Sequence, residues 1–380
     1  MNIILHDLEA HLTFAPLTLT RPVGNLRMGI FTNDERWKNY CSAASVSFKT
    51  EDYLSGKFPC ETKADNFWVN AAVVPNQTLA DMVSELNSGE ALYVNNQFIA
   101  YRGSEYGRGA RIDKTLEDLI VLKHRWDIFG LNDKVLKNDF DWVKANRNGV
   151  QLDTSNQFIG SADQLFIEEG AIVQGAILNT TTGPIYVGKH AEIMEGSIVR
   201  GGLALCEHAA LKLGSKVYGA TTIGPYCKVG GEVNNVVFYA YSNKGHDGFL
   251  GNSVIGEWCN LGADTNTSNL KNNYGFVSTY DYKTKKFEKT DIQFMGLVMG
   301  DHSKSGINTM FNTAAVVGVS STIFGAGFPP KFIPNFSWGG FDNELFQFEL
   351  ALLAANNMMS RRGLQLSDEE KSILKRISNI

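Results

Sequence analysis

The sequence lacks three features that would place it in well-known classes of protein. Its 380 residues contain no run of about 18 apolar residues, the length a helix needs to cross a membrane. It has no block of basic residues and a net charge of -5, so it lacks the basic patch that is typical of proteins that bind nucleic acid. Its start, MNIILHDLEAHL, is too short and too acidic for a signal peptide. We therefore expect a cytoplasmic protein that binds neither nucleic acid nor membrane.

Cysteine is also scarce. The five cysteines are an odd number and show no C-x-x-C spacing, which argues against a disulfide framework and against a zinc site. Cys227 and Cys259 fall on the small inward place of the repeat described next, so we predict that they are buried packing residues.

A six-residue repeat is the main feature that the sequence does have. From Val187 to Asn234 the chain reads VGKHAE, IMEGSI, VRGGLA, LCEHAA, LKLGSK, VYGATT, IGPYCK, VGGEVN, and every hexad opens on an aliphatic residue. A period of six places successive aliphatic residues on different sides of an α-helix, which excludes a helix here. It is typical of a β-helix, in which three hexads form one coil around an aliphatic interior.

The same phase recurs outside this block, at residues 167–173, 255–261 and 305–323. The intervals between blocks are 14, 26 and 44 residues, each two more than a multiple of six. We therefore expect insertions near residues 179–186, 235–254 and 265–304. Insertions in a solenoid form surface loops, which often carry the function.

The regions on either side of the repeat have other patterns. Residues 1–148 alternate short strand and helix candidates, among them a helix opened by a capping box at Thr32, a hairpin with an Asn-Asn turn in residues 91–101, and a helix over about residues 132–146. This mixture predicts an α/β domain without a repeat. Residues 160–340 are assigned to the β-helix. Residues 341–380 have helical spacing and a capping box at Ser367, so we predict C-terminal helices that cover the open end of the coil.

The histidines are the first candidates for chemistry. His246 lies in YSNKGHDGFLG, out of phase with the hexads and next to Asp247. An imidazole on a loop, with a carboxylate to orient it, suits a general base. The same sequence pattern is equally compatible with an ordinary loop histidine that has no catalytic role. His190 and His208 are one coil apart and are predicted to stack on one corner, as a solvated column rather than a metal pair.

The third expected insertion begins with NLGADTNTSNLKNN, a cluster of Asn and Thr that ends near Lys271. Amide and hydroxyl groups bind sugar hydroxyls, and a lysine can meet a phosphate. The same residues could equally be turn formers that satisfy their own backbone. The following YDYKTKKFEKT predicts a hairpin with a lysine-rich tip.

Together these stretches resemble the bifunctional N-acetylglucosamine-1-phosphate uridylyltransferase / glucosamine-1-phosphate N-acetyltransferase family, particularly a divergent branch from Bacteroidetes. GHDGFLGN is similar to the family's G-H-L-T-Y-L-G-D segment, and NLGADTNTSN to its N-I-G-A-G-T-x-T-x-N stretch. The resemblance is strongest from about residue 160 to 340. It implies a left-handed parallel β-helix that works as a homotrimer, with acetyl-coenzyme A bound between neighbouring coils.

The resemblance also implies roles for single residues. His246 takes the catalytic position. Substrate contacts fall to Lys244, Phe249, Asn260, Asn269 and Lys271. Coenzyme contacts fall to Ala263 and Gly306. The exposed apolar side chains expected at Ile198, Tyr218 and Val236 agree with a trimer, because a monomer has no need of them.

The N-terminal domain departs from the family's pattern. Sugar nucleotidyltransferases open on a glycine-rich L-x-x-G-x-G-T-R loop whose backbone amides hold a triphosphate. Here the first strand leads into LHDLEAHLTFAPLTLTRPVGNLRMG, which has no such glycines. By resemblance, Arg21 and Arg27 would serve the phosphates, and Asp7 would be a ligand for Mg²⁺.

Two functions remain open at this point. The first is an enzyme of sugar-nucleotide biosynthesis, with a sugar-1-phosphate nucleotidyltransferase-like domain fused to an acetyl-CoA-dependent N-acetyltransferase that acts on an amino-sugar phosphate. The second is a trimeric binding or regulatory protein, in which an inactive nucleotidyltransferase domain senses a sugar nucleotide. The missing glycine loop favours the second for the first domain, and His246 favours catalysis for the coil.

Overall fold

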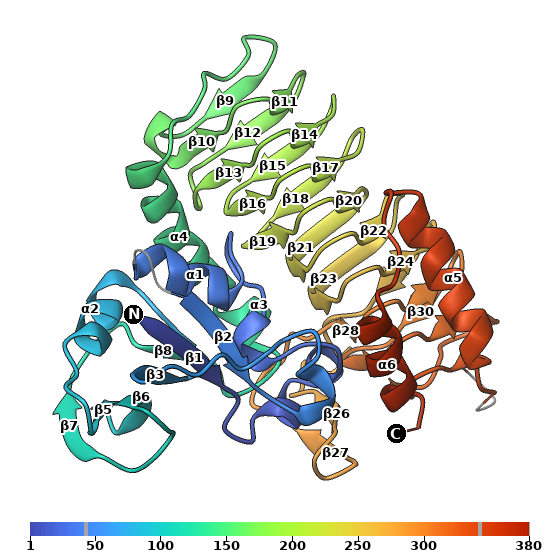
Figure 1. Cartoon of the computed structure of the whole chain (residues 1–380). Coiled ribbons are helices and arrows are strands. Elements are labelled where there is room, and N and C mark those ends of the chain that lie inside the picture. The colour runs from blue at the N-terminus through green and yellow to red at the C-terminus, as the bar shows by residue number, and fades with distance from the viewer. Residues whose placement is uncertain (42–44, 341–343, 380) are drawn as a thin grey trace. The chain divides into compact units, whose positions relative to one another are not determined.

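A computed structural model describes residues 1–41, 45–340 and 344–379 (Figure 1). The chain divides into two compact units, residues 1–26 with 31–125 and residues 27–30 with 126–380. The predicted α/β domain, parallel β-helix and C-terminal helices are all present. Within the described ranges, no helix is both long enough and apolar enough to cross a membrane.

The boundary between the units differs from the one expected near residue 148. Helices α3 (Asp127–Gly130) and α4 (Asn132–Asn146) belong to the unit that contains the coil. The reason is a buried polar link at Asn132, which accepts a hydrogen bond from the N–H of Gly29 at 2.7 Å and donates one to the Thr222 hydroxyl at 3.1 Å. The helix expected over residues 132–146 is therefore present as α4, but it packs with the coil and not with the N-terminal sheet.

The first unit is built on a six-stranded sheet in the order β2-β1-β3-β6-β5-β7. Strand β1 pairs in parallel with β2 and β3, so the carboxyl ends of these three strands share one edge, where Asp7 follows β1. The strands and helices of this unit are β1 (Asn2–His6), β2 (Ser45–Lys49), β3 (Asn66–Asn70), β4 (Val73–Val74), β5 (Glu90–Val94), β6 (Gln97–Gly103), β7 (Ala110–Lys114), β8 (Ile120–Val121), α1 (Asn33–Tyr40) and α2 (Gln77–Ser84).

Local signals in the sequence account for several of these elements. Helix α1 begins with the predicted capping box, in which Thr32 and Glu35 satisfy each other's backbone N–H groups. The hairpin of β5 and β6 turns at Asn95 and Asn96, which have φ values of 49° and 63°. Two successive residues at positive φ match the right-handed twist of the flanking strands, so the Asn-Asn pair was a sound prediction of the turn.

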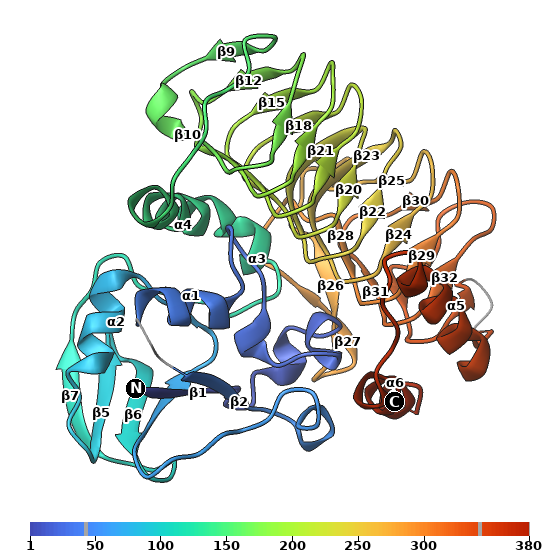
Figure 2. The same ribbon diagram turned by 45° about the horizontal axis from the view of Figure 1, so that its top comes forward.

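In the second unit, strands stack in parallel to form the coil, whose successive turns can be followed in Figure 2. One flat face is a nine-stranded sheet made of β11 (Ile172–Val173), β14 (Glu192–Ile193), β17 (Ala210–Leu211), β20 (Lys228–Val229), β22 (Asn243–Lys244), β24 (Asn260–Leu261), β29 (Lys304–Ser305), β32 (Thr322–Ile323) and β34 (Trp338–Gly339). We call this sheet the β22 face.

The other strands of the coil form a 13-stranded sheet that bends between two faces, because β21 and β23 each run along both. Asn235 and Asn252, at φ 53° and 46°, make these bends. The strands are β9 (Gln157–Ile159), β10 (Leu165–Ile167), β12 (Ile177–Asn179), β13 (Ile185–Val187), β15 (Ile198–Arg200), β16 (Leu203–Leu205), β18 (Lys216–Tyr218), β19 (Thr221–Ile223), β21 (Glu232–Phe238), β23 (Phe249–Ile255), β28 (Leu297–Met299), β31 (Ala315–Val317) and β33 (Phe332–Ile333).

The hexad pattern fixes the interior of the coil. The aliphatic residues that open the hexads from Val187 to Val229 are all buried in one continuous core. Cys227 and Cys259 belong to that core and are fully buried, as predicted. Each large aliphatic side chain removed from water contributes about 1.5–3 kcal/mol, which is why a period of six was a reliable signal.

One of the three expected insertions is absent. Residues 235–254 continue the coil as the end of β21, β22 and the start of β23, with shortened corners between them. The 26-residue interval therefore holds one short coil of 15 residues, from Val229 to its register partner Lys244, and two sides of the next coil. Val236 is buried in the core instead of facing outward, so it offers nothing to a partner. Ile198 does face outward and is 46% exposed.

The largest insertion occupies residues 268–296, between β25 (Asn266–Thr267) and β28. Strand β25 still pairs with β30 (Met310–Phe311) in the coil, so the excursion is shorter than the predicted 265–304. It contains the expected hairpin, formed by β26 (Ser278–Asp281) and β27 (Lys286–Lys289). Tyr280 of the hairpin stacks on Phe332 with ring centroids 3.5 Å apart.

One corner of the coil carries a column of stacked rings. His190 and His208 stack with centroids 5.0 Å apart, as predicted from their spacing. The column continues through Tyr226, Tyr241 and Trp258 at centroid distances of 4.7, 5.0 and 4.2 Å. All five residues have φ between 54° and 60°, because each occupies the same left-handed turn position of its coil.

The chain ends in helices α5 (Phe348–Ser360) and α6 (Asp368–Ile377), the second of which has the predicted capping box at Ser367. We expected these helices to cover the open end of the coil. Instead the chain runs back beside the later coils (Figures 1 and 2), and Arg362 donates a hydrogen bond to the carbonyl of Tyr226 at 3.2 Å. The end of α5 therefore lies over the β22 face.

Candidate functional site

Three columns of residues run across the β22 face, at right angles to its strands. The central column consists of Lys228, Asn243, Asn260 and Lys304, which are cross-strand partners on four successive strands. Two residues earlier on these strands stand aromatic residues of the ring column, among them Tyr241 and Trp258. Two residues later stand glycines, namely Gly230, Gly245, Gly262 and Gly306. Polar side chains are thus bordered by flat rings on one side and by glycines on the other.

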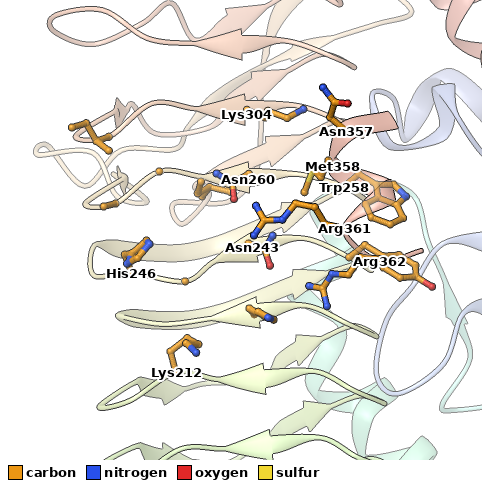
Figure 3. A pocket seen from close by; sticks show the side chains of 17 residues that line it. Lys212, Asn243, His246, Trp258, Asn260, Lys304, Asn357, Met358, Arg361 and Arg362 are labelled. Atoms are coloured by element: carbon orange, nitrogen blue, oxygen red, sulfur yellow. The ribbon is translucent and has the colours of Figure 1, made fainter. Parts of the chain in front are cut away.

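The end of α5 and this face together enclose a cavity of about 870 Å³, shown in Figure 3. A cavity of this size fits a ligand larger than a simple sugar. Its wall comes from five strands and corners of the coil and from the residues around the end of the helix. The lining residues are Lys212, Lys228, Tyr241, Asn243, Gly245, His246, Trp258, Asn260, Leu261, Gly262, Ala263, Lys304, Ile307, Asn357, Met358, Arg361 and Arg362.

The charge of the cavity is entirely positive. Five of its lining side chains are cations, and none of the described residues that line it is Asp or Glu. Burial lowers the pKa of Lys228, and the nearby charges of Arg362, Lys212 and Arg361 lower it further. Burial also lowers the pKa of Lys304. Glu192, outside the lining, acts on the pKa of Lys228 in the opposite direction, but its effect is the smallest of those on Lys228. The cations therefore repel one another, and the cavity favours an anionic ligand.

One neutral side chain in the cavity is incompletely satisfied. The Oδ1 atom of Asn243 is buried, and no described residue donates a hydrogen bond to it. An unsatisfied buried acceptor costs about 1–3 kcal/mol, so it marks a place where a ligand N–H or O–H group would be favourable. In Figure 3, Arg361 points from the end of α5 toward this part of the column.

The structure brings together three of the predicted site residues. His246, Asn260 and Ala263 all line the cavity. His246 lies on the corner between β22 and β23, where its side chain is exposed, so it stands on a corner of the coil and not on an insertion. No described residue forms a hydrogen bond or ion pair with the His246 ring, Asp247 included.

The other predicted contacts of the coil lie outside the cavity lining. Phe249 begins β23, and its N–H donates to Asn266. Asn269 donates to Asn252 at 2.8 Å, and the Lys271 ammonium donates to the carbonyl of Phe276 at 2.7 Å. Gly306 stands between the lining residues Lys304 and Ile307. Lys244 is only 1% exposed, inside the coil. The binding roles assigned to these five residues by resemblance therefore remain predictions.

All five cations of the cavity were missed by sequence reasoning. Lys228, Asn243 and Asn260 are 15 and 17 residues apart, and Lys304 follows after another 44. These irregular spacings hid the fact that they occupy one column. A count that allowed coils of unequal length would have aligned them. Nothing in the sequence connected Arg361 and Arg362 with this face, because that contact depends on how the C-terminal helix packs.

In the first unit, Asp7 is buried at the carboxyl end of β1. One of its oxygens accepts the N–H of Val23 at 3.0 Å, and the other accepts the Thr50 hydroxyl at 2.6 Å. Burial raises the pKa of Asp7 to about 7. The described residues hold no group of three potential His, Cys, Asp or Glu ligands. Because both oxygens already hold the protein's own donors, this arrangement does not fit a bound Mg²⁺ ion, and we derive no step through one.

The two arginines expected to bind phosphates are both buried. Arg21 is 3% exposed in the first unit. Arg27 is 7% exposed in the second unit, where its guanidinium donates to the carbonyl of Ile30 at 2.8 Å. Arg27 thus supports the backbone of its own segment, and a role of either arginine toward a triphosphate remains a prediction.

Comparison with known proteins adds independent findings. Residues 3–148 match the family model described as sugar nucleotidyl transferase. That match runs from the first strand of the first unit through α4, the helix that packs in the unit of the coil.

The chain also matches curated proteins. The chain is 23% identical over 288 residues to the bifunctional protein GlmU of Wigglesworthia glossinidia brevipalpis, covering 68% of this chain and 54% of that protein. It is 26% identical over 165 residues to GlmU of Synechococcus elongatus, covering 41% and 32%. With GlmU of Methanocaldococcus jannaschii it shares 37% identity over 73 residues, covering 19% and 17%. The chain thus spans about half the length of the first relative, and less of the other two.

Proposed function

We propose that this chain is a transferase of sugar-nucleotide biosynthesis, in which the coil transfers the acetyl group of acetyl-CoA to the amine of an amino-sugar phosphate. The observation that carries the proposal is the cavity of the β22 face, where His246 is combined with five cations and no carboxylate. The similarity to GlmU, a bifunctional protein, supports it.

The positive charge supports a ligand rich in phosphate. Coenzyme A has a pyrophosphate and a further phosphate on its ribose, and an amino-sugar phosphate brings another. Lys212, Lys228 and the two arginines are placed to neutralise these groups, since charge-assisted hydrogen bonds to phosphate are about twice as strong as neutral ones. Gly245 and Gly262 line the cavity beside them without side chains, so an extended chain such as pantetheine can lie close to the strands there.

The chemistry that the cavity supports is direct attack by an amine. A thioester is already activated, so the protein has to align the amine with it and remove one proton. The amine nitrogen attacks the carbonyl carbon while the His246 imidazole takes the amine proton. The carbon–sulfur bond then breaks, and the departing thiolate takes that proton from the imidazolium. The orphaned oxygen of Asn243 offers an acceptor for an N–H or O–H group of either substrate.

The direct test is a two-substrate assay of the purified chain. Acetyl-CoA and glucosamine-1-phosphate are mixed with the protein, and release of the free thiol is followed together with the N-acetylated product. We expect thiol release that depends on the amine substrate. Failure with every amino-sugar phosphate tried, or thiol release that is equal without the amine, would contradict the proposal.

For the first domain we expect slow or absent nucleotidyl transfer. Buried arginines cannot replace a cradle of backbone amides in positioning a triphosphate, so the rate should lie below about 1 per second. Pyrophosphate release from a nucleoside triphosphate and a sugar-1-phosphate measures this. Faster release would contradict the expectation. If such release is seen, Arg21→Ala and Arg27→Ala should each abolish most of it, because both arginines are predicted to bind the phosphates.

A second candidate function applies to this domain alone. The same buried arginines and the missing glycine loop favour a domain that binds a sugar nucleotide without reacting with it. Titration calorimetry with a nucleoside diphosphate sugar, combined with the pyrophosphate assay, separates a sensor from a nucleotidyltransferase. A sensor binds the sugar nucleotide but releases no pyrophosphate from a nucleoside triphosphate.

We further propose that the chain assembles as a homotrimer through the outer faces of the coil. Ile198 is 46% exposed on β15 and lies in register with the half-buried Ile177 on β12, which forms an apolar strip on the surface. Light scattering at micromolar concentration should give three times the mass of one chain. Ile198→Asp should shift that mass toward the monomer, whereas Ile172→Asp, the same change at a 52% exposed isoleucine on the β22 face, should leave it unchanged. A wild-type monomer would contradict this proposal.

A further inference from the structure

Lys244 occupies a place in the coil that belongs to an aliphatic residue. It pairs in register with Val229 on β20, which in turn pairs with Leu211 on β17, and both of these side chains are fully buried in the core. Lys244 is 1% exposed. Burying an ammonium group is costly unless it is hydrogen-bonded, so its presence in this column requires an explanation.

Two backbone carbonyls hold the ammonium group. Its Nζ atom donates to the carbonyl of Gly230 at 3.0 Å and to the carbonyl of His246 at 2.9 Å. Gly231 leaves the room for it, since a Cβ atom there would lie 2.8 Å from Nζ. Burial lowers the pKa of Lys244 to about 8, while Asp247 and Asp264 favour the charged form. The group therefore remains mostly protonated at neutral pH.

The backbone of the corner shows why the second of these bonds matters. The carbonyls of Lys244, Asp247 and Gly248 each accept an N–H from a neighbouring coil. The carbonyl of His246 accepts the Lys244 ammonium instead. The His246 ring has no partner among the described residues, so its direction is set by the backbone that carries it. Lys244 is thus the side chain that fixes this backbone from inside the coil.

We infer that Lys244 is a positioning residue, which holds the corner of His246 in place from within the core. The inference rests on the proposed acetyl transfer. An aliphatic residue would pack in this column at least as well, but it would leave the carbonyl of His246 without a donor and the corner free to shift. A displacement of about 1 Å at a reacting group can cost on the order of 100-fold in rate.

The test compares Lys244→Met with the wild type. Methionine keeps the length of the side chain and removes both hydrogen bonds. Loss of those bonds and relief of the buried charge act in opposite directions on stability, so we expect the melting temperature to change by less than about 4 °C. We expect turnover of acetyl transfer to fall by about 10- to 100-fold. The KM for acetyl-CoA should change little, because the cations of the cavity are untouched.

Three controls separate positioning from a general packing role. Leu211→Met, a volume-conserving change in the same inward column, should keep wild-type turnover. Lys244→Gln, which retains N–H donors, should recover part of the loss. In a His246→Ala background, Lys244→Met should lower turnover by less than about 3-fold, because the group that it positions is gone. Wild-type turnover in Lys244→Met, or full additivity with His246→Ala, would overturn the inference.

A further measurement does not depend on activity. Hydrogen exchange of the amides at residues 245–248 reports how firmly the corner is held. We expect exchange in Lys244→Met to be at least about 10-fold faster there than in the wild type, with the adjacent strands unchanged. Equal exchange rates would overturn the inference even if the protein proved to have no acetyltransferase activity. Absence of activity in the wild type would instead reject the proposed function.

Discussion

His246→Ala is expected to lower the turnover of acetyl transfer by about 100- to 10,000-fold, the usual contribution of a positioned general base. The described residues that line the cavity include no serine and no cysteine, so no covalent acyl-enzyme is available to replace direct attack. Without the imidazole, the proton of the attacking amine has to leave to water. The loss corresponds to about 2.7–5.4 kcal/mol of transition-state stabilisation.

The measurement is the rate of thiol release at saturating acetyl-CoA and amino-sugar phosphate. The KM for acetyl-CoA should stay close to the wild-type value, and the melting temperature should not fall, because the side chain is exposed on a corner outside the core. His190→Ala is a matched control, since His190 is also exposed on a corner but does not line the cavity. Wild-type turnover in His246→Ala would assign the proton transfer to another group and reject this mechanism.

The fold was predictable wherever a local rule and the packing agreed. The hexads fixed the interior of the coil because each aliphatic residue that opens a hexad is buried. The capping boxes at Thr32 and Ser367 marked two helix starts correctly. The rule failed at residues 235–254, where a polar residue takes an inward place. Lys244 there looked like a loop residue, and a loop was therefore expected.

The site was less predictable than the fold, and for a physical reason. His246, Asn260 and Ala263 could be found because short segments around them resemble a known family. The cations come from three coils, at Lys212, Lys228 and Lys304, and from the end of α5, so no local segment contains two of the coil lysines together with an arginine. Their convergence is a property of strand register and helix packing, which a linear pattern does not record.

The double variant Arg361→Ala/Arg362→Ala is expected to raise the KM for acetyl-CoA by about 100- to 1,000-fold. Both guanidinium groups enter the cavity from the end of α5 and face the lysines of the coil. A hydrogen bond to a charged group contributes about 1.5–3 kcal/mol, or roughly 10- to 100-fold for each arginine. Part of the loss is offset because removing two cations relieves the repulsion that now lowers the pKa of Lys228.

Turnover at saturating acetyl-CoA should remain within about 3-fold of the wild type, because the general base is untouched and uniform binding energy affects KM alone. Lys283→Ala/Lys285→Ala, at the tip of the β26–β27 hairpin, removes the same net charge away from the cavity and should leave KM unchanged.

Arg362 also donates to the carbonyl of Tyr226, so Arg361→Ala alone is measured to separate ligand binding from anchoring of the helix. If the double variant keeps the wild-type KM, the phosphates of the ligand lie elsewhere. The positive cavity would then have to serve another anion.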